Sequence, residues 1–174
     1  MSVLKHALIA FAAGLGLASP PAMAQVSNSG YVLPLALALD AAREAVSACA
    51  SRGYDVTATV VDIDGMVQVA LRGDHATVHT KDSSYRKAYT AVSMGPIFRF
   101  TVTSQYLEVV SKYAPLAGKS LVDTPNISAL PGGAVISAHG EIVAGLGVGG
   151  APGAEKDEAC AVAGVAKIKD RLPN

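Results

Sequence analysis

The chain has 174 residues, of which 14 are basic and 14 are acidic, so its formal net charge is 0. No run of lysine or arginine stands out, and a nucleic-acid-binding domain normally carries a basic face, so we expect no nucleic-acid partner. Charged residues make up only 16% of the chain, and a surface so poor in charge is typical of a subunit of a homo-oligomer.

The first 24 residues have the pattern of a cleavable secretory signal peptide. Lys5 gives a positive start, residues 7–18 form an uncharged apolar stretch, and Ala-Met-Ala precedes the expected cleavage point after Ala24. The apolar stretch is too short to span a membrane, and no later stretch is long enough. We therefore expect a periplasmic or secreted protein with no membrane span in the mature chain.

The remaining sequence is long enough for one domain with a substantial core. We expect residues 25–33 to be a flexible lead-in and residues 34–174 to form that single domain. From Pro34, apolar residues recur at spacings of three and four, which predicts a helix that ends at Gly53.

The rest of the chain alternates between helices and strands joined as hairpins. We expect, in chain order, a β-hairpin over residues 54–74 with its turn at Asp64-Gly65, a helix over 76–94 ended by Gly95-Pro96, a shorter helix over 101–114, loop-like sequence over 115–133, strands over 134–138 and 141–148, and a closing helix over 156–172. Hairpin connections imply an antiparallel sheet with helices packed on it, which is an α+β fold.

The segment GLGVGG, residues 145–150, has the G-x-G-x-x-G spacing of a dinucleotide-binding loop. That loop must open a strand–helix–strand unit, but here only one helix and a tail follow, so we reject the dinucleotide interpretation. Gly145, Gly147 and Gly149 instead fall on one face of a strand. Such a bare face lets a helix, another subunit or a flat ligand approach the backbone closely.

The same stretch resembles a known family. The chain's ending, LPGGAVISAHGEIVAGLGVGGAPGAEKDEACAVAG, is similar to that of the small haem-binding GlcG/HbpS-like family, sometimes called haem-degrading domains. The segments VVDIDGMVQVALRGDHA and RKAYTA resemble that family's middle motifs, and the resemblance covers residues 33–169. The chain departs from the family at His75, where glycine is usual, and at Gly149, where serine is usual.

The resemblance implies a profilin-like fold, in which a five-stranded antiparallel sheet lies between helices in α/β/α layers, and it implies homo-oligomers built from dimers. It also implies haem b as the cofactor of an exported haem-binding protein that buffers haem, delivers it or serves a periplasmic redox partner. One alternative is an enzyme that slowly degrades haem or turns over peroxide at the bound iron. A second alternative is a sensor or interaction module that binds a small carboxylate or a partner protein.

Haem iron takes histidine, cysteine, methionine or tyrosine as an axial ligand. His79 is the first candidate for the ligand of the haem iron and His75 the second, because both follow the family's R-x-D motif and open the helix with the K-A-x-T-A motif. The alternative for both is an ordinary surface histidine at a helix start. Tyr85 and Tyr89 are expected to be core residues, with tyrosinate ligation as their alternative role. His139, in a predicted turn, is expected to be solvated.

The other expected cofactor contacts are charged residues and glycines. Arg72, Arg86 and Lys87 are expected to provide positive charges for the haem propionates or another carboxylate, and the alternative for Lys87 is a solvated position on its helix. Gly147 and Gly149 are expected to lie against the flat cofactor. No G-x-S-x-G motif and no marked pair of carboxylates occurs, so any enzymatic chemistry is expected to come from the cofactor.

The two cysteines, Cys49 and Cys160, form no C-x-x-C motif, which argues against a zinc or thioredoxin-type site. Export allows a disulfide, and in the arrangement that the resemblance implies the first and last helices pack side by side. We nevertheless favour two separate buried thiols, because the family motif has a cysteine at position 160 without needing a partner. Asp157 is expected to stabilise the first turn of the closing helix through the helix dipole.

Overall fold

The computed structural model describes residues 29–174, so the expected signal peptide, its cleavage site and residues 25–28 of the lead-in lie outside the described residues. The elements in chain order are α1 (Leu35–Ala50), β1 (Thr57–Asp62), β2 (Val67–Arg72), α2 (Thr80–Phe98), α3 (Thr103–Ser111), α4 (Pro115–Asp123), β3 (Gly133–Ala138), β4 (Glu141–Gly149), α5 (Ala154–Ile168) and a 3-10 turn (Lys169–Arg171). Among these residues, no helix combines the length and the apolar composition needed to cross a membrane.

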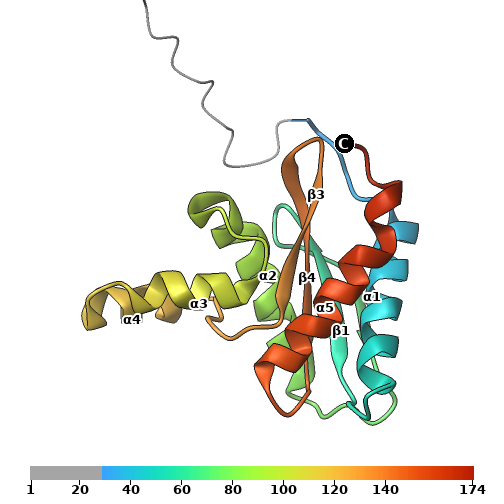
Figure 1. Ribbon diagram of the computed structural model, residues 1–174, viewed down its shortest axis with the longest axis horizontal. Coiled ribbons are helices and arrows are strands. Elements are labelled where there is room, and N and C mark those ends of the chain that lie inside the picture. The colour runs from blue at the N-terminus through green and yellow to red at the C-terminus, as the bar shows by residue number, and fades with distance from the viewer. Residues whose placement is uncertain (1–28) are drawn as a thin grey trace, which may run out of the picture.

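The strands form one antiparallel sheet in the order β2-β1-β4-β3. Helices α1 and α5 lie side by side on one face of the sheet, and α2 covers the other face (Figure 1). The α+β class and the layered arrangement are therefore confirmed. The sheet has four strands within the described residues instead of the expected five, and Val102 adds only an isolated bridge to Ala134 on β3.

Small side chains bring α1 and α5 close together above the sheet. Ala41, Ala42 and Ala45 on α1 have no exposed surface. Gly164 on α5 lies so close to α1 that an added Cβ would stand 2.5 Å from the carbonyl oxygen of Ala41. The main hydrophobic core lies between this helix pair and the sheet, and burial of its valines and leucines stabilises the fold.

Helix α2 packs on the bare glycine face of β4. A Cβ added at Gly145 would lie 2.5 Å from the carbonyl oxygen of Ala88, and one added at Gly147 would collide with the carbonyl oxygen of Ser84. On the neighbouring strand β1, the hydroxyl of Thr59 bonds the hydroxyl of Ser84 at 2.7 Å in the buried interface. The sequence left a helix, another subunit or a flat ligand as the neighbour of this glycine face. In the structure the neighbour is helix α2.

We expected this helix to end at Gly95-Pro96. In the structure α2 continues to Phe98. Gly95 is buried, and an added Cβ would lie 3.0 Å from Ile142, so its missing side chain permits close packing against the sheet. Proline keeps a φ angle suited to a helix, and its costs are the hydrogen bond of its absent N–H and the crowding of its ring against the preceding turn. The helix ends only where Arg99 takes a φ of 55°.

The segment expected to be loop-like, residues 115–133, contains the helix α4. Pro115 takes the first helical position, where its missing N–H costs nothing, and Lys119 pairs with Asp123 one turn later. The proline and glycine of this segment were therefore wrongly interpreted as loop residues. Helices α3 and α4, residues 103–123, form an arm that projects from the body of the domain (Figure 1).

An aromatic cluster holds the root of this arm. Tyr106 on α3 is fully buried, and the centre of its ring lies 5.7 Å from that of Phe98 and 5.6 Å from that of Phe100. Its hydroxyl donates a hydrogen bond to the carbonyl of Leu121. Burial, and after it the neighbouring Tyr113, raises the pKa of Tyr106 above its ordinary value of 10.0. The phenol is therefore neutral at physiological pH and acts as a hydrogen-bond donor.

The described end of the lead-in lies against the domain. Leu33 is buried in the main core, and the ring of Tyr31 lies edge-on to that of His139 at 5.7 Å. His139 is exposed and has a φ of 52° in the turn between β3 and β4, as expected for a solvated turn residue.

Cys49 and Cys160 form a disulfide between the end of α1 and the first half of α5. The preference for two separate thiols was wrong. The close, antiparallel packing of the two helices brings the Cα atoms of these residues to 5.6 Å, within the range that a disulfide requires. Both cysteines have no exposed surface, so the bond lies inside the core.

We predict that replacing both cysteines with alanine lowers the free energy of unfolding by about 2–5 kcal/mol, because the bond closes a long loop in the unfolded chain. Urea unfolding of the oxidised wild type and of the double variant measures this difference. Mass spectrometry of the non-reduced protein is the control, since alkylation of both cysteines in the wild type would show that the bond does not form.

Candidate functional site

A cleft of about 420 Å³ opens between the second half of α1, the segment just before β1 and the end of β2 with the turn that follows it. Its volume lies within the range of about 300–1,000 Å³ that is usual for small-molecule sites. Val46, Leu71 and the ring of Tyr54 form apolar parts of its lining. Two of the predicted site residues, Arg72 and His75, lie together in this cleft.

Arg72 holds the turn that presents His75. It is the last residue of β2, and its Nε donates a 2.7 Å hydrogen bond to the carbonyl of Ala76, which also accepts one from its Nη2. The N–H of Ala76 in turn donates to the carbonyl of Gly73. Arg72 therefore acts first as a clamp that closes residues 73–76, and His75 is exposed within that turn.

His79 lies one turn further along the chain, at the N-cap position of α2, and it is exposed. Its Nδ1 is 3.0 Å from the hydroxyl oxygen of Thr77. Histidines that bind metals usually have their second ring nitrogen held in this way, which leaves Nε2 as the nitrogen for a ligand bond. His79 does not line the cleft itself, whereas His75 does.

Arg86 and Lys87 lie on α2 outside the cleft, so the structure does not bring them together with Arg72 and His75. The Nη2 of Arg86 donates to the carbonyl of Ile127 and holds that loop against α2. Lys87 is only 2% exposed, which excludes the alternative of a solvated helix position.

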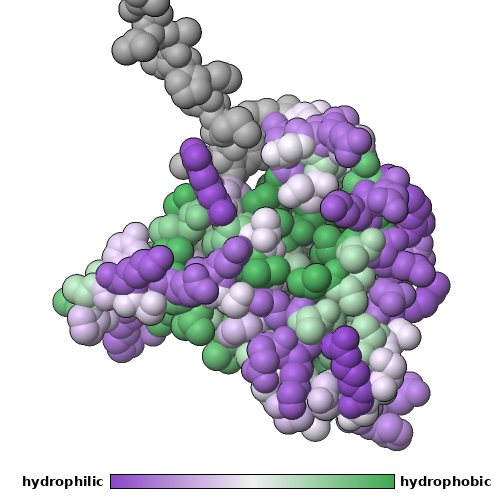
Figure 2. Space-filling view, in the orientation of Figure 1, coloured by the Kyte–Doolittle hydropathy of each residue, from purple (hydrophilic) through white to green (hydrophobic). Residues whose placement is uncertain are grey.

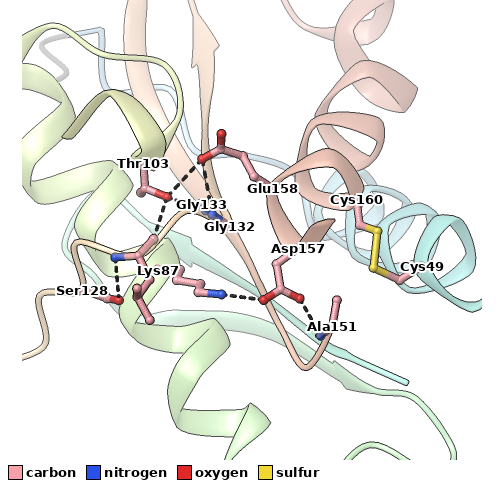
Figure 3. Close-up of polar contacts among 11 residues, drawn as sticks. Cys49, Lys87, Thr103, Ser128, Gly132, Gly133, Ala151, Asp157, Glu158 and Cys160 are labelled. Carbon is pink, nitrogen blue, oxygen red and sulfur yellow. Dashed lines mark hydrogen bonds and ion pairs between the residues drawn. A yellow bond between two sulfur atoms is a disulfide. The ribbon is translucent and has the colours of Figure 1, made fainter. Parts of the chain in front are cut away.

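Lys87 forms a buried ion pair with Asp157, with 2.6 Å between Nζ and Oδ2 (Figure 3). The other carboxylate oxygen of Asp157 accepts a 2.9 Å hydrogen bond from the N–H of Ala151. Asp157 does lie in the first turn of α5, as expected, but its role as counter-ion to Lys87 was not predicted. A charged pair with both partners this deeply buried needs such additional hydrogen bonds to offset its desolvation.

Glu158 is the polar residue of this region that the sequence analysis missed. Its Oε2 accepts a 2.8 Å hydrogen bond from the N–H of Ser104 at the start of α3 and a 3.3 Å bond from the N–H of Gly132. The adjacent carboxylates Asp157 and Glu158 therefore connect α5 with α2, with the arm and with the segment before β3 (Figure 3). Nothing in the spacing of these two acids predicts that partner set.

The remaining candidates also lie outside the cleft. Gly147 and Gly149 are buried beneath α2, whose backbone and side chains fill the space beside them. Tyr85 and Tyr89 are half-buried with their rings 5.9 Å apart, as expected for core residues. Among residues 29–174, histidine, cysteine and carboxylate side chains form no group of three or more that suits a metal ion.

Comparisons with known proteins give one family. A family model described as haem degrading protein HbpS-like matches residues 33–166. A double mutant of HbpS from Streptomyces reticuli is 38% identical, with a TM-score of 0.71 over 86% of this chain and 97% of that chain. The structure of a PduOC–haem complex is 26% identical, with a TM-score of 0.69 over 79% of this chain and 96% of that chain.

A third solved structure, the Klebsiella pneumoniae protein ORFY, has a TM-score of 0.69 over 83% of this chain and 97% of that chain. At 24% identity it shows the shared fold alone. A search of curated protein sequences gives no match.

We predict that Lys87→Met and Asp157→Leu each lower the free energy of unfolding by about 3–5 kcal/mol, because each leaves one buried charge without its partner. The double variant should be destabilised by clearly less than the sum of the two, since it removes both charges. Urea unfolding of the four proteins measures the coupling. Lys167→Ala, which breaks an exposed pair with Glu44, is the control and should change little. Strictly additive effects would contradict the ion pair.

Proposed function

Since the chain belongs to the HbpS-like haem-degrading protein family, we propose that it is an exported haem-binding protein that uses the cleft beside His75. The observation that carries this proposal is the meeting of an exposed imidazole, an apolar wall and arginine side chains in one cleft. A similar structure, PduOC, is described in complex with haem.

The residues of the cleft suit haem in their chemistry. Haem needs an axial ligand such as histidine, apolar contacts for the porphyrin and cations for its propionates. His75 supplies the first, and Val46, Leu71 and Tyr54 supply the second. Arg43 supplies the third, because its side chain is 73% exposed and its ion pair with Asp40 is long, at 3.9 Å.

Two histidines compete for the role of iron ligand. His75 is favoured by its place in the lining of the cleft. His79, the first candidate from the sequence, is favoured by the 3.0 Å contact of its Nδ1 with the hydroxyl of Thr77, because an Nδ1–H that donates to this oxygen leaves Nε2 for the iron. His75 lies within the turn that Arg72 clamps, and His79 follows three residues after Ala76, at the N-cap position of α2.

Bound haem would supply iron for electron transfer or for peroxide chemistry. The chain's own residues hold it and orient it, and this suits buffering, delivery or service to a periplasmic redox partner. The disulfide in the core supports export, because such bonds persist in oxidising compartments and are rare in the cytosol. The low share of charged residues supports a homo-oligomer built from dimers.

A second candidate function is slow degradation of the bound haem, and the description of the family model favours it. In the part of the chain that the structure describes, the side chains beside His75 in the cleft are arginines and aspartates as well as apolar groups. Peroxide-dependent loss of the Soret band, faster than for free haemin, would establish this activity. Stable haem under peroxide would leave the binding function alone.

We predict that the purified mature chain binds haemin with a Soret band distinct from that of free haemin. His79→Ala and His75→Ala are to be titrated in parallel, and the variant that lacks the ligand should bind at least about tenfold more weakly or show a shifted band, because an iron bond is lost. His139→Ala is the matched control, since His139 lies at the turn between β3 and β4.

Two results would contradict the proposal in different ways. Wild-type affinity and spectrum in the double variant His75→Ala, His79→Ala would remove this segment as the site of iron ligation. A wild-type chain without any haemin-dependent band would remove haem binding altogether and favour a module for a small carboxylate or a protein partner.

A further inference from the structure

Tyr54 lies between α1 and β1, where the backbone fixes the place of its side chain at the cleft. Gly53, the residue before it, has a φ of 76°, which turns the chain sharply after α1. The N–H of Tyr54 donates a 3.1 Å hydrogen bond to the carbonyl of Cys49 at the end of α1. The side chain of Tyr54 is half-buried, packs against the main core and lines the cleft.

Lys156, in the first turn of α5, lies over the ring of Tyr54. Its Nζ is 5.2 Å from the ring centroid, within the distance of about 6 Å at which an aromatic face attracts a cation. Lys156 is not part of the lining of the cleft, and within residues 29–174 it forms no ion pair. The ammonium takes one face of the ring, so a flat ligand in the cleft can stack only on the opposite face.

The disulfide holds these two residues near each other. Cys160 lies one helical turn after Lys156 on α5, and it is bonded to Cys49. The carbonyl of Cys49 is in turn the acceptor for the N–H of Tyr54. A covalent bond, a backbone hydrogen bond and the cation–π contact therefore join the end of α1, the ring of Tyr54 and the start of α5 into one unit.

Hydrophilic side chains gather at the lower end of the molecule, where α1 ends and α5 begins (Figures 1 and 2). A flat apolar ligand that binds here therefore depends on the apolar parts of the cleft, which are Val46, Leu71 and the ring of Tyr54. Aliphatic side chains provide contact area without a preferred orientation, whereas an aromatic ring favours defined stacked or edge-on arrangements with another ring. Among these three side chains, Tyr54 is thus the one that can set the plane of the ligand.

We propose that the ring of Tyr54 stacks on the porphyrin plane and that Lys156 is a positioning residue, which holds the ring in place for it. This inference rests on the haem-binding cleft of the proposed function and names the ligand class that the cleft recognises. That class is the flat porphyrin macrocycle itself, with or without a metal. The bond between iron and histidine then adds to an affinity that the macrocycle already has.

The test uses iron-free protoporphyrin IX, whose fluorescence changes when it leaves water, and the mature oxidised chain. Tyr54→Leu should weaken binding about three- to tenfold, because leucine keeps apolar area but cannot stack. Tyr54→Phe keeps the ring and should restore the wild-type affinity. Circular dichroism checks that every variant is folded.

A second set of variants tests the role of Lys156. Lys156→Gln should weaken porphyrin binding about two- to fivefold, a loss no larger than the cation–π contact can cause. Lys156→Arg should restore the affinity, because a guanidinium makes the same contact with the ring. Lys167→Gln, at an exposed position on the same helix, is the matched control and should bind like the wild type.

The two sets are then combined. In the Tyr54→Leu background, Lys156→Gln should have no further effect, because Lys156 acts through the ring. A further loss in that background would make Lys156 a direct contact of the ligand and would overturn its positioning role. The comparison of Lys156→Gln with Lys156→Arg tests the inference even if Tyr54→Leu does not fold.

Other results would overturn the inference in distinguishable ways. Unchanged porphyrin affinity in folded Tyr54→Leu would exclude stacking on the ring, and equal losses in Tyr54→Leu and Tyr54→Phe would assign the effect to the hydroxyl. A wild type that binds haemin but no iron-free porphyrin would remove this inference and leave the proposed function standing. A wild type that binds neither would remove both.

Discussion

The close contact of α2 with the glycine face of β4 is the constraint on which the rest of the structure depends. At Gly145 and Gly147 the helix backbone takes the space that a Cβ would need, so no other residue type fits there without moving the helix. Hydroxyl pairs between β1 and α2, such as Thr59 with Ser84, satisfy the polar groups of this tight interface. The result is a rigid frame in which both ends of α2 have fixed positions.

The two ends of that helix then place the functional parts. Its first residue, Thr80, follows directly on the segment that carries His75 and His79, and the hydroxyl of Thr80 bonds that of Thr57 on β1 at 2.7 Å. Lys87, near the middle of α2, forms an ion pair with Asp157 at the start of α5. The next residue, Glu158, accepts a hydrogen bond from the N–H of Ser104 and so holds the first turn of the arm. The cleft and the arm are therefore supported by one helix, and the disulfide fixes α1 and α5 on the opposite face of the sheet.

Patterns local in sequence were enough for part of this account. The sequence predicted three features that each depend on neighbouring residues. They are helix α1, the hairpin of β1 and β2, and the placement of the β4 glycines on one face of the strand. The pairing of Lys87 with Asp157 joins residues 70 positions apart, and no pattern predicts it. Pro96 and Pro115 were interpreted as breaks because proline favours both breaks and first turns, and only tertiary packing decides between them. The family resemblance supplied haem, which the cleft alone does not specify.

The central claim is that haem lies in the cleft formed by α1, the end of β2 and the turn held by Arg72. Hydrogen–deuterium exchange of the oxidised mature chain, with and without haemin, tests it most directly, because bound ligand slows the opening of the backbone that it contacts. The account predicts slower exchange in residues 72–80 and in the second half of α1, with β4 and α2 already protected in the free chain. Slower exchange confined to β3 and α5, with residues 72–80 unchanged, would contradict it.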